Sequence, residues 1–315
     1  ALILNGHMDT VGIDGMAIEP FKPFAENGRV HGRGACDMKG ALAAMIGSIK
    51  SLADSGSKLK GDLIFTGVVD EEHKSLGTKK LVQEYKADAA IVGEPTGNKI
   101  ATAHKGFVWV EIETKGKAAH GSVPEKGVDA IAHAAKIVSA LEILQRNLES
   151  RTHGLLGSPR IHTSTIEGGT DWSIVPERCM VRLERRTLPG ETTAAVMEEI
   201  QGILRHIRRE NKDFHAAARD AYEMPPLETV ASEPIVLHLR QAVADTIGRS
   251  DPLIGVPYWT DGALLSALGA IPTCVFGPGD IGVAHSADEY VTIDEVFSAA
   301  EVYREIALRF CGQAL

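Results

Sequence analysis

The feature that most constrains the fold is an alternation, from the start of the chain, between short apolar runs and segments of helical period. Apolar, β-rich runs at residues 1–6, 61–70 and 87–94 predict buried strands, and the spacing of apolar residues over 40–56 and 76–86 predicts helices. Strands that alternate with helices are joined by crossover connections. The sequence therefore predicts an α/β fold, a doubly wound sheet with helices on both faces.

The pattern changes near Lys105, where residues 106–118 alternate apolar and polar side chains as a half-buried antiparallel strand does. The segments that follow are a helix over about 128–148, strands near 160–166 and 173–188, a helix over about 192–209 and a closing run at 213–224. This order is that of the ferredoxin-like split βαβ sandwich. We predict a catalytic α/β domain made of residues 1–104 and 219–315, with a small α+β domain, 105–218, inserted in it.

Composition excludes several classes of protein. The 315 residues carry a net charge of −9, which argues against a partner such as nucleic acid. No apolar run reaches the roughly 18 residues of a membrane span. The cysteines are far apart, without metal-ligand spacing, so we expect reduced thiols and a cytoplasmic protein; they are Cys36, Cys179, Cys274 and Cys311. Because Ala1 already begins a strand, we expect an upstream segment of the domain to be missing.

Acidic and imidazole side chains follow the predicted strands. His7 and Asp9 follow the first strand, Asp70, Glu71 and Glu72 the second, and Glu94 the third; Asp37 lies in a glycine-rich turn before a helix, and His285 follows the apolar run 271–276. Ligands of doubly wound sheets bind at the carboxyl ends of the strands. So many carboxylates packed together without cations would repel one another.

Counting charges indicates how many metal ions such a cluster needs. Three carboxylate ligands and two neutral histidines are neutralised by two divalent cations and a bridging hydroxide, whereas one cation leaves a surplus negative charge. The ligands are nitrogen and oxygen, which suits zinc and also admits cobalt or manganese. The bridging water would be acidified, and a free carboxylate nearby could take its proton.

The motifs together resemble a known family, that of the dinuclear zinc amidohydrolases and metallopeptidases. It includes acetylornithine deacetylase, succinyl-diaminopimelate desuccinylase, aminoacylase and glutamate carboxypeptidase. The matching stretches run from residue 6 to residue 290: "GHMDTV", "GRGACDMKG", "DEEHKSLG", "GEPT", "GKAAHGSVPEKGVDAI", "RRTLPGE" and "GPGDIGVAHSADEY". The resemblance implies a zinc-peptidase-like catalytic domain, and it implies that residues 105–218 form a lid and dimerisation domain of a homodimer.

The resemblance also assigns the metal ligands. It implies that His7 and Glu94 hold one metal, that Glu72 and His285 hold the other, and that Asp37 bridges the two. These two ions would be zinc, or else cobalt or manganese.

Other roles are implied in the same way. Asp9 would orient His7, Glu71 would be the general base that activates the bridging water, and His120 would reach a partner's active site and stabilise the oxyanion. Arg186 would bind a substrate carboxylate, with Arg185 as the second choice.

Two further positions are expected to contact substrate. They are Gly277 and Ser173, and Ser173 stands where many relatives have an asparagine. We interpret the other histidines as structural or surface residues, among them His31, His104, His162 and His238.

The expected activity is hydrolysis of the amide bond of a small N-acyl amino acid. A carboxypeptidase or dipeptidase acting on small peptides is the first alternative, because the same site serves both reactions. A non-catalytic relative that binds small ligands is the second, and a phosphohydrolase the third, although the turn around Asp37 lacks the Gly-Lys-Ser/Thr ending of a phosphate-binding loop.

Overall fold

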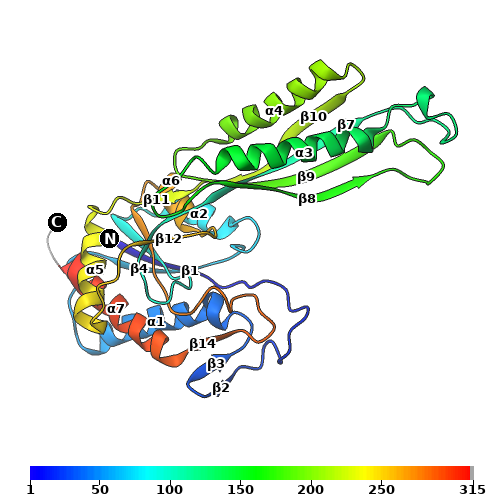
Figure 1. The fold of residues 1–315 in the computed structure, drawn as a ribbon. Helices are drawn as coiled ribbons and strands as arrows, with labels where there is room; N and C mark the ends of the chain where they lie inside the picture. The colour runs from blue at the N-terminus through cyan, green and yellow to red at the C-terminus, as the bar shows by residue number, and fades with distance from the viewer. Residues whose placement is uncertain (313–315) are drawn as a thin grey trace. The chain divides into compact units, whose positions relative to one another are not determined.

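The computed structural model describes residues 1–312, which divide into two compact units (Figure 1). The first contains residues 1–104 and 227–315, and the second residues 105–226. The predicted boundary at residue 219 falls inside a strand, β10 (His215–Met224). That strand stays paired with its neighbour as far as Met224 and ends at Pro225 and Pro226, which cannot donate to a sheet ladder. The boundary therefore lies at the prolines.

The first unit is built on a seven-stranded sheet with the order β11, β6, β13, β5, β1, β4, in which β12 also pairs with β6. Strands β4, β1, β5 and β13 run parallel, as predicted, while β11 is antiparallel to β6. The strands are β1 (Leu2–His7), β4 (Leu63–Val68), β5 (Ala89–Val92), β6 (Ala101–His104), β11 (Leu227–Glu228), β12 (Ile254–Val256) and β13 (Thr273–Val275). Every residue of β1 and β5 is buried, because helices cover both faces of the sheet.

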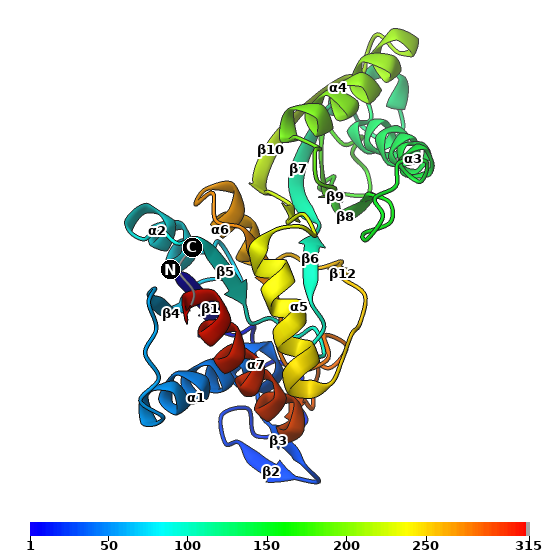
Figure 2. The same cartoon turned by 90° about the vertical axis from the view of Figure 1, so that its left-hand side faces the viewer.

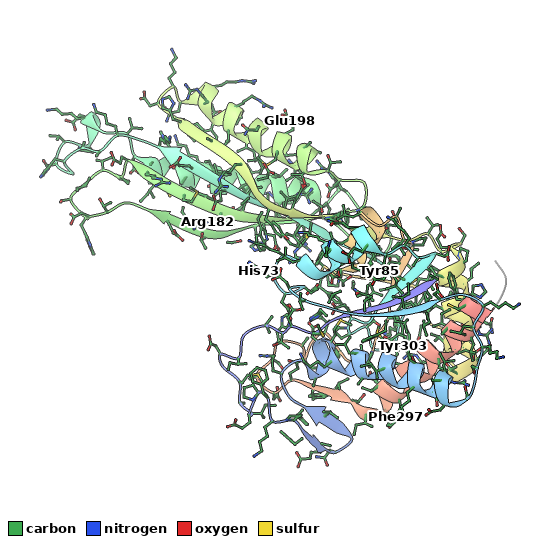
Figure 3. All side chains as sticks on the ribbon, turned by 180° about the vertical axis from the view of Figure 1, so that it is seen from behind. His73, Tyr85, Arg182, Glu198, Phe297 and Tyr303 are labelled. Carbon is green, nitrogen blue, oxygen red and sulfur yellow. The ribbon has the colours of Figure 1, made fainter. Side chains whose placement is uncertain are left out.

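Helices form one layer on each face of this sheet (Figure 2). One layer holds α1 (Gly40–Asp54), α5 (Pro234–Ile247) and α7 (Ile293–Gly312), and the other holds α2 (Leu76–Glu84) and α6 (Gly262–Ala267). In the first layer Tyr303 of α7 is fully buried, and its hydroxyl donates to the carbonyl oxygen of Phe276 at 2.6 Å (Figure 3). The α/β fold predicted from the periodicity is confirmed.

A small three-stranded sheet was not predicted. It consists of β2 (Phe24–Glu26), β3 (Arg29–His31) and β14 (Tyr290–Thr292). Two short helices were not predicted either: η1 (Ala35–Lys39) and η2 (Pro124–Lys126). Strands of three residues are too short for an alternation of side chains to be recognised, and β14 pairs with a segment far away in the sequence.

The second unit is an antiparallel sheet of the order β10, β7, β9, β8, and α3 and α4 cover one face (Figure 1). Its elements are β7 (Gly106–Lys115), α3 (Ala130–Leu148), β8 (Arg160–Gly168), β9 (Arg178–Thr187), α4 (Thr193–Glu210) and β10. Alternate residues of β7 and β9 pack against the helices, and the others form an open face. Figure 3 shows Arg182 projecting from this open face and Glu198 from α4. Asp129 and Thr192 cap the two helices.

Two sequence-based expectations concern membrane spans and the redox state of the cysteines. All four cysteines are buried and free. Across residues 1–312, every helix is too short or too polar to cross a membrane.

Candidate metal centre and active site

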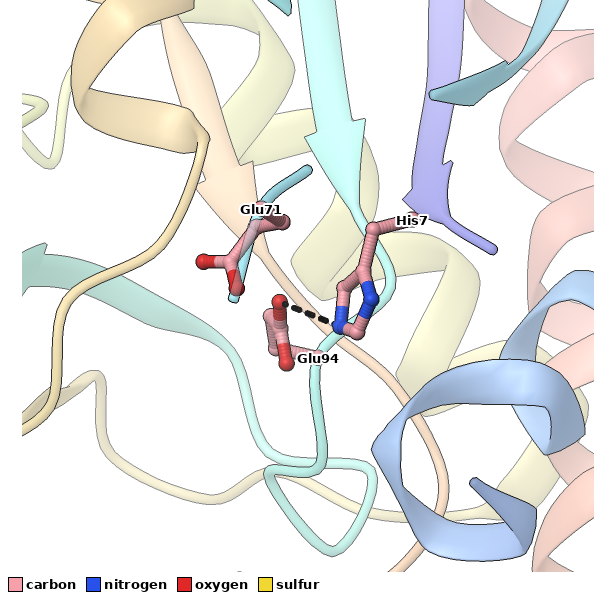
Figure 4. A group of neighbouring side chains, drawn as sticks. All are labelled: His7, Glu71 and Glu94. Atoms are coloured by element: carbon pink, nitrogen blue, oxygen red, sulfur yellow. Dashed lines mark ion pairs between the residues drawn. The ribbon is translucent and has the colours of Figure 1, made fainter. Parts of the chain in front are cut away.

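The carboxyl ends of three neighbouring parallel strands supply the core of the site. His7 is the last residue of β1, Glu71 and Glu72 lie in the turn after β4, and Glu94 follows β5. Because β4, β1 and β5 are adjacent and parallel, their ends meet at one edge of the sheet. Figure 4 shows the side chains of His7, Glu71 and Glu94 converging there.

Asp37 contacts two histidines with its two oxygen atoms. The Nε2 atom of His7 lies 2.8 Å from Oδ1 of Asp37, and Nε2 of His285 lies 3.1 Å from Oδ2. The turn that carries Asp37 therefore brings together residues at opposite ends of the chain. A carboxylate that offers one oxygen to each of two imidazole groups has the geometry of a bridging ligand.

The remaining acidic residues divide between the two histidines. Oε1 of Glu94 lies 3.6 Å from Nε2 of His7, and Oε1 of Glu72 lies 3.3 Å from Nε2 of His285. Ligand atoms of His7, Glu71 and Glu94 lie within 4.8 Å of one another, as do those of His7, Asp37 and Glu72. The structure thus brings all of these predicted residues into one cluster.

Asp9 holds His7 differently from our expectation. The Nδ1 atom of His7 lies 3.0 Å from the backbone oxygen of Asp9, whereas the nearest carboxylate oxygen is 3.7 Å away. The carboxylate instead accepts from the backbone N–H of Glu72 at 3.1 Å. Asp9 therefore orients the imidazole chiefly through its carbonyl group, and its side chain ties down the turn that carries Glu71 and Glu72.

The electrostatics of the cluster are those of carboxylates that lack cations. Burial opposes a charge on His7, but hydrogen bonding to Asp37 and Asp9 outweighs it and raises the pKa of His7 to about 12. Hydrogen bonds to Asp37 and Glu72 raise the pKa of His285 to about 10. Both imidazole groups therefore bind protons strongly, because the carboxylates around them attract positive charge.

Three carboxyl groups in and beside the cluster show the same surplus of negative charge. Burial, and then the charge of Asp261, raises the pKa of Glu71, while burial and the charge of Asp37 raise that of Glu94. Burial likewise raises the pKa of Asp261. Two divalent cations would supply the missing positive charge, and the nitrogen and oxygen donors suit zinc, cobalt or manganese. The residues present fit a pair of such metals.

Glu289 anchors the site and was missed by the sequence analysis. Its carboxylate is fully buried and accepts from Arg33 at 2.6 Å and from the backbone N–H groups of Gly34, Cys36 and Asp37 at 3.0 to 3.1 Å. It stands four residues after His285, so one side chain connects the two metal-bearing segments. In the sequence it follows Asp288 and resembles an ordinary exposed acidic residue.

Two glycines allow close backbone approaches around the site. Gly34 has φ 77°, and a Cβ atom there would meet Thr10 at 2.6 Å. At Gly277 a Cβ atom would lie 2.2 Å from the backbone oxygen of Gly93, beside Glu94. The N–H of Gly277 donates to Thr96, and its carbonyl accepts from Thr96 and Asn98. Gly277 is thus buried, with both polar groups used internally, and its close approach to Gly93 places it beside the Glu94 loop.

His120 and Ser173 lie together in the second unit. The backbone N–H of Gly121 donates to the carbonyl of Ser173 at 2.6 Å, and His120 pairs with Ile174 as an isolated bridge. The Nδ1 atom of His120 accepts from the backbone N–H of Ser122 at 3.1 Å. The ring proton is therefore on Nε2, and the side chain is exposed.

The two adjacent arginines have different surroundings. Arg185 is fully buried, and its guanidinium pairs with Glu191 at 2.6 Å. Arg186 lies on the open face of the sheet, with its side chain 31% exposed and its Nε atom 2.6 Å from Glu184. Arg185 therefore belongs to the interior of the second unit, and Arg186 is half-buried on its open face beside Glu184.

The remaining histidines lie outside the cluster. Among residues 1–312, the groups with ligand atoms close enough to share a metal contain none of His31, His104, His162 and His238. His31 stacks on Phe24, and His104 is fully buried against Trp259.

A pH dependence of stability follows from the raised pKa of His7. The folded protein keeps this proton up to about pH 12, whereas an unfolded histidine loses it near pH 6.5. The metal-free protein therefore has this stabilisation in full below pH 6.5 and loses it as the pH rises. Above pH 6.5, each pH unit lowers the contribution of this proton to the free energy of unfolding by about 1.4 kcal/mol. We expect the melting temperature of chelator-treated protein to fall between pH 6.5 and 9. With zinc added, the melting temperature should fall less over the same pH range. Equal pH dependences of the melting temperature with and without zinc, measured by fluorescence, would contradict this interpretation.

The chain is similar to several known proteins. A model of Peptidase family M20/M25/M40 matches residues 3–309. The chain is 30% identical over 319 residues to the acetylornithine deacetylase of Myxococcus xanthus, covering 99% of this chain and 80% of that protein. The structure of aminopeptidase PepT from Bacillus cereus matches with a TM-score of 0.80 and 26% identity, covering 97% of this chain and 79% of that one.

A third similarity concerns the metal centre. A dinuclear metal-binding M20 peptidase from Bacillus subtilis has the same fold, with a TM-score of 0.76 at 18% identity, covering 99% of this chain and 82% of that chain. Together with the similarity to the acetylornithine deacetylase, the matched family model shows that the chain belongs to peptidase family M20/M25/M40 and is a hydrolase.

Proposed function

We propose that this protein hydrolyses the amide bond of small N-acyl amino acids with the help of two divalent metal ions. The observation that supports this most directly is the position of Asp37, whose two oxygens face His7 and His285 separately. His7 and Glu94 would hold one ion, Glu72 and His285 the other, and Asp37 both. Zinc is our first choice, with cobalt or manganese as alternatives.

When bound, the two cations would polarise the amide carbonyl and acidify a water molecule. Glu71 would act as the general base. It is half-buried beside His7 and Glu94, where burial raises its pKa, and this supports a role in which it accepts a proton. It would take the proton of the attacking water and return it to the leaving amine.

His120 would stabilise the oxyanion that forms during this attack. Since Nδ1 of His120 accepts from the backbone of Ser122, the exposed Nε2–H is the donor available to a substrate oxygen. Arg186 would bind the substrate carboxylate with its terminal nitrogens. The exposed hydroxyl of Ser173, which donates to Asp171, lies near His120 in the chain fold and would contact the same substrate.

Replacing His120 by alanine tests its role. We expect kcat to fall by about 10²- to 10³-fold, the usual effect of removing one oxyanion donor, with unchanged metal content and melting temperature. Steady-state kinetics with metal analysis would measure this. The exposed His206→Ala variant, on α4, is a control in the same unit and should keep full activity. Wild-type turnover in the His120 variant would exclude the role.

We also propose a homodimer formed through the second unit. Strand β8 is at the edge of its sheet, and most of its residues are exposed, including Ile166 at 50%. A long exposed edge strand is a template for pairing with another chain. Such a dimer would let His120 act in the partner's active site.

A carboxypeptidase or dipeptidase is the alternative function, and the similarity to aminopeptidase PepT supports peptide substrates in general. A non-catalytic ligand-binding relative is a weaker alternative, because the complete cluster includes Glu71. The experiment that separates them is amine release from N-acetyl and N-succinyl amino acids and from dipeptides. Release from one acyl class alone supports the deacylase, and release from dipeptides alone supports the peptidase.

A further inference from the structure

Two arginines stand directly opposite each other on the open face of the second unit's sheet. Arg160 of β8 pairs in register with Arg186 of β9. Their neighbours Ile161 and Arg185 are buried under the helices, so the side chains of Arg160 and Arg186 both emerge on the open face. Directly opposite residues of antiparallel strands have Cβ atoms about 4.5–5.5 Å apart, and like charges there are destabilising.

The other arginines of this face are neutralised by carboxylates. Arg178 pairs with Glu113, Arg182 with Glu111 and Glu167, and Arg219 with Glu111. Arg160 is the exception, since it is exposed and forms no ion pair or side-chain hydrogen bond with the residues of 1–312. Arg160 thus faces a second guanidinium without a carboxylate of its own, and such an arrangement favours the binding of an anion.

The surroundings increase the positive charge at this point. Lys105 donates to the backbone oxygen of Ser158 at 2.6 Å, and burial, followed by the charges of Arg160 and Arg186, lowers its pKa. Glu184 is the carboxylate that faces them. It binds Nε of Arg186 at 2.6 Å and accepts from the indole of Trp109 at 3.0 Å. Glu191 is the other carboxylate that acts on Lys105. Its guanidinium partner is the buried Arg185, so Arg160 keeps an uncompensated charge on the open face.

We propose that Arg160 and Arg186 form a two-guanidinium site that selects substrates whose recognised end carries two carboxylates. An N-acylated acidic amino acid, or a peptide ending in one, has this chemistry. The inference rests on the proposed function, in which Arg186 binds one carboxylate. Arg160 would bind the second, and each planar guanidinium can hold a carboxylate through two parallel hydrogen bonds.

The test compares N-acetylglutamate with N-acetylglutamine, which differ by one charge. Wild type is expected to prefer the glutamate compound by at least about 10-fold in kcat/KM. Arg160→Gln should lower kcat/KM for N-acetylglutamate by roughly 10- to 100-fold, mainly through KM, and for N-acetylglutamine by less than about 3-fold. Arg160→Lys should recover part of the loss. Arg178→Gln, on the same face but beside Glu113, is the matched control and should behave as wild type.

Binding is measured in parallel by calorimetry on chelator-treated protein, without turnover. Tighter binding of N-acetylglutamate that is lost in Arg160→Gln would support the site even if neither compound is hydrolysed, in which case the proposed function fails and the inference stands. If wild type hydrolyses both compounds and Arg160→Gln lowers kcat/KM equally for the two, or for neither, the inference is overturned and the proposed function stays intact. Absence of both differential binding and differential hydrolysis would also overturn it.

Discussion

Replacing Glu71 by glutamine is expected to lower kcat by about 10²- to 10⁴-fold while the protein keeps both metal ions. The amide fills the same space but cannot take a proton from water, so the loss is that of a general base. KM should change little, because Glu71 is not a proposed substrate contact. The effect is measured by steady-state kinetics together with metal analysis of the dialysed protein.

The position of Glu71 makes this experiment decisive. Its oxygen atoms lie close enough to His7 and Glu94 to share a metal with them. If Glu71→Gln loses one metal ion, Glu71 is a ligand and the assignment of the base is wrong. Glu72→Gln is the matched control in the adjacent position, and it is expected to lose metal because Glu72 faces His285.

Removing the carboxylate of Glu289 should have the largest effect on stability. In Glu289→Ala, the buried Arg33 would lose its partner and three backbone N–H groups would lose their acceptor. Breaking a buried ion pair on one side costs about 3–5 kcal/mol, so urea unfolding should show a decrease of this size in the free energy of unfolding. Metal affinity should fall as well, because Asp37 and His285 are positioned through Glu289.

Two further variants separate charge from packing. Glu289→Gln keeps an oxygen acceptor and should lose less stability than the alanine variant, though Arg33 remains uncompensated. Asp288→Ala removes the exposed neighbouring carboxylate and should be close to neutral. A Glu289→Ala protein with unchanged stability and metal affinity would show that the turn of Asp37 is held by other contacts.

Much of the site could be predicted from the sequence, because the sheet itself brings the residues together. Once residues 1–6, 61–70 and 87–94 are taken as neighbouring parallel strands, the side chains after them must meet at one edge. For this reason the convergence of His7, Glu72 and Glu94 could be predicted without knowing the geometry of their side chains. The ferredoxin-like order of the second unit was predicted in the same way, from the alternation of strand and helix periods.

The rest depends on contacts that no local pattern encodes. The role of Glu289 requires the turn of Asp37 to close onto a segment about 250 residues away. The pairing of Arg160 with Arg186 depends on the register of β8 and β9. A shift of this register by one residue would place a different residue opposite Arg186. The carbonyl of Asp9 orients His7, and a backbone group carries no mark in the sequence. Gly277 was assigned to substrate, although its tight fit against Gly93 accounts for a glycine there.

The most direct test of the two-metal mechanism is a titration of chelator-treated protein with zinc. Activity on the best substrate of the amine-release panel is followed as metal is added, and bound metal is measured in the same samples. The structure predicts no hydrolysis without metal, two ions bound per chain, and loss of the second ion in His285→Ala. Full activity in the chelator-treated protein, or a chain that binds no zinc, would contradict the proposed mechanism.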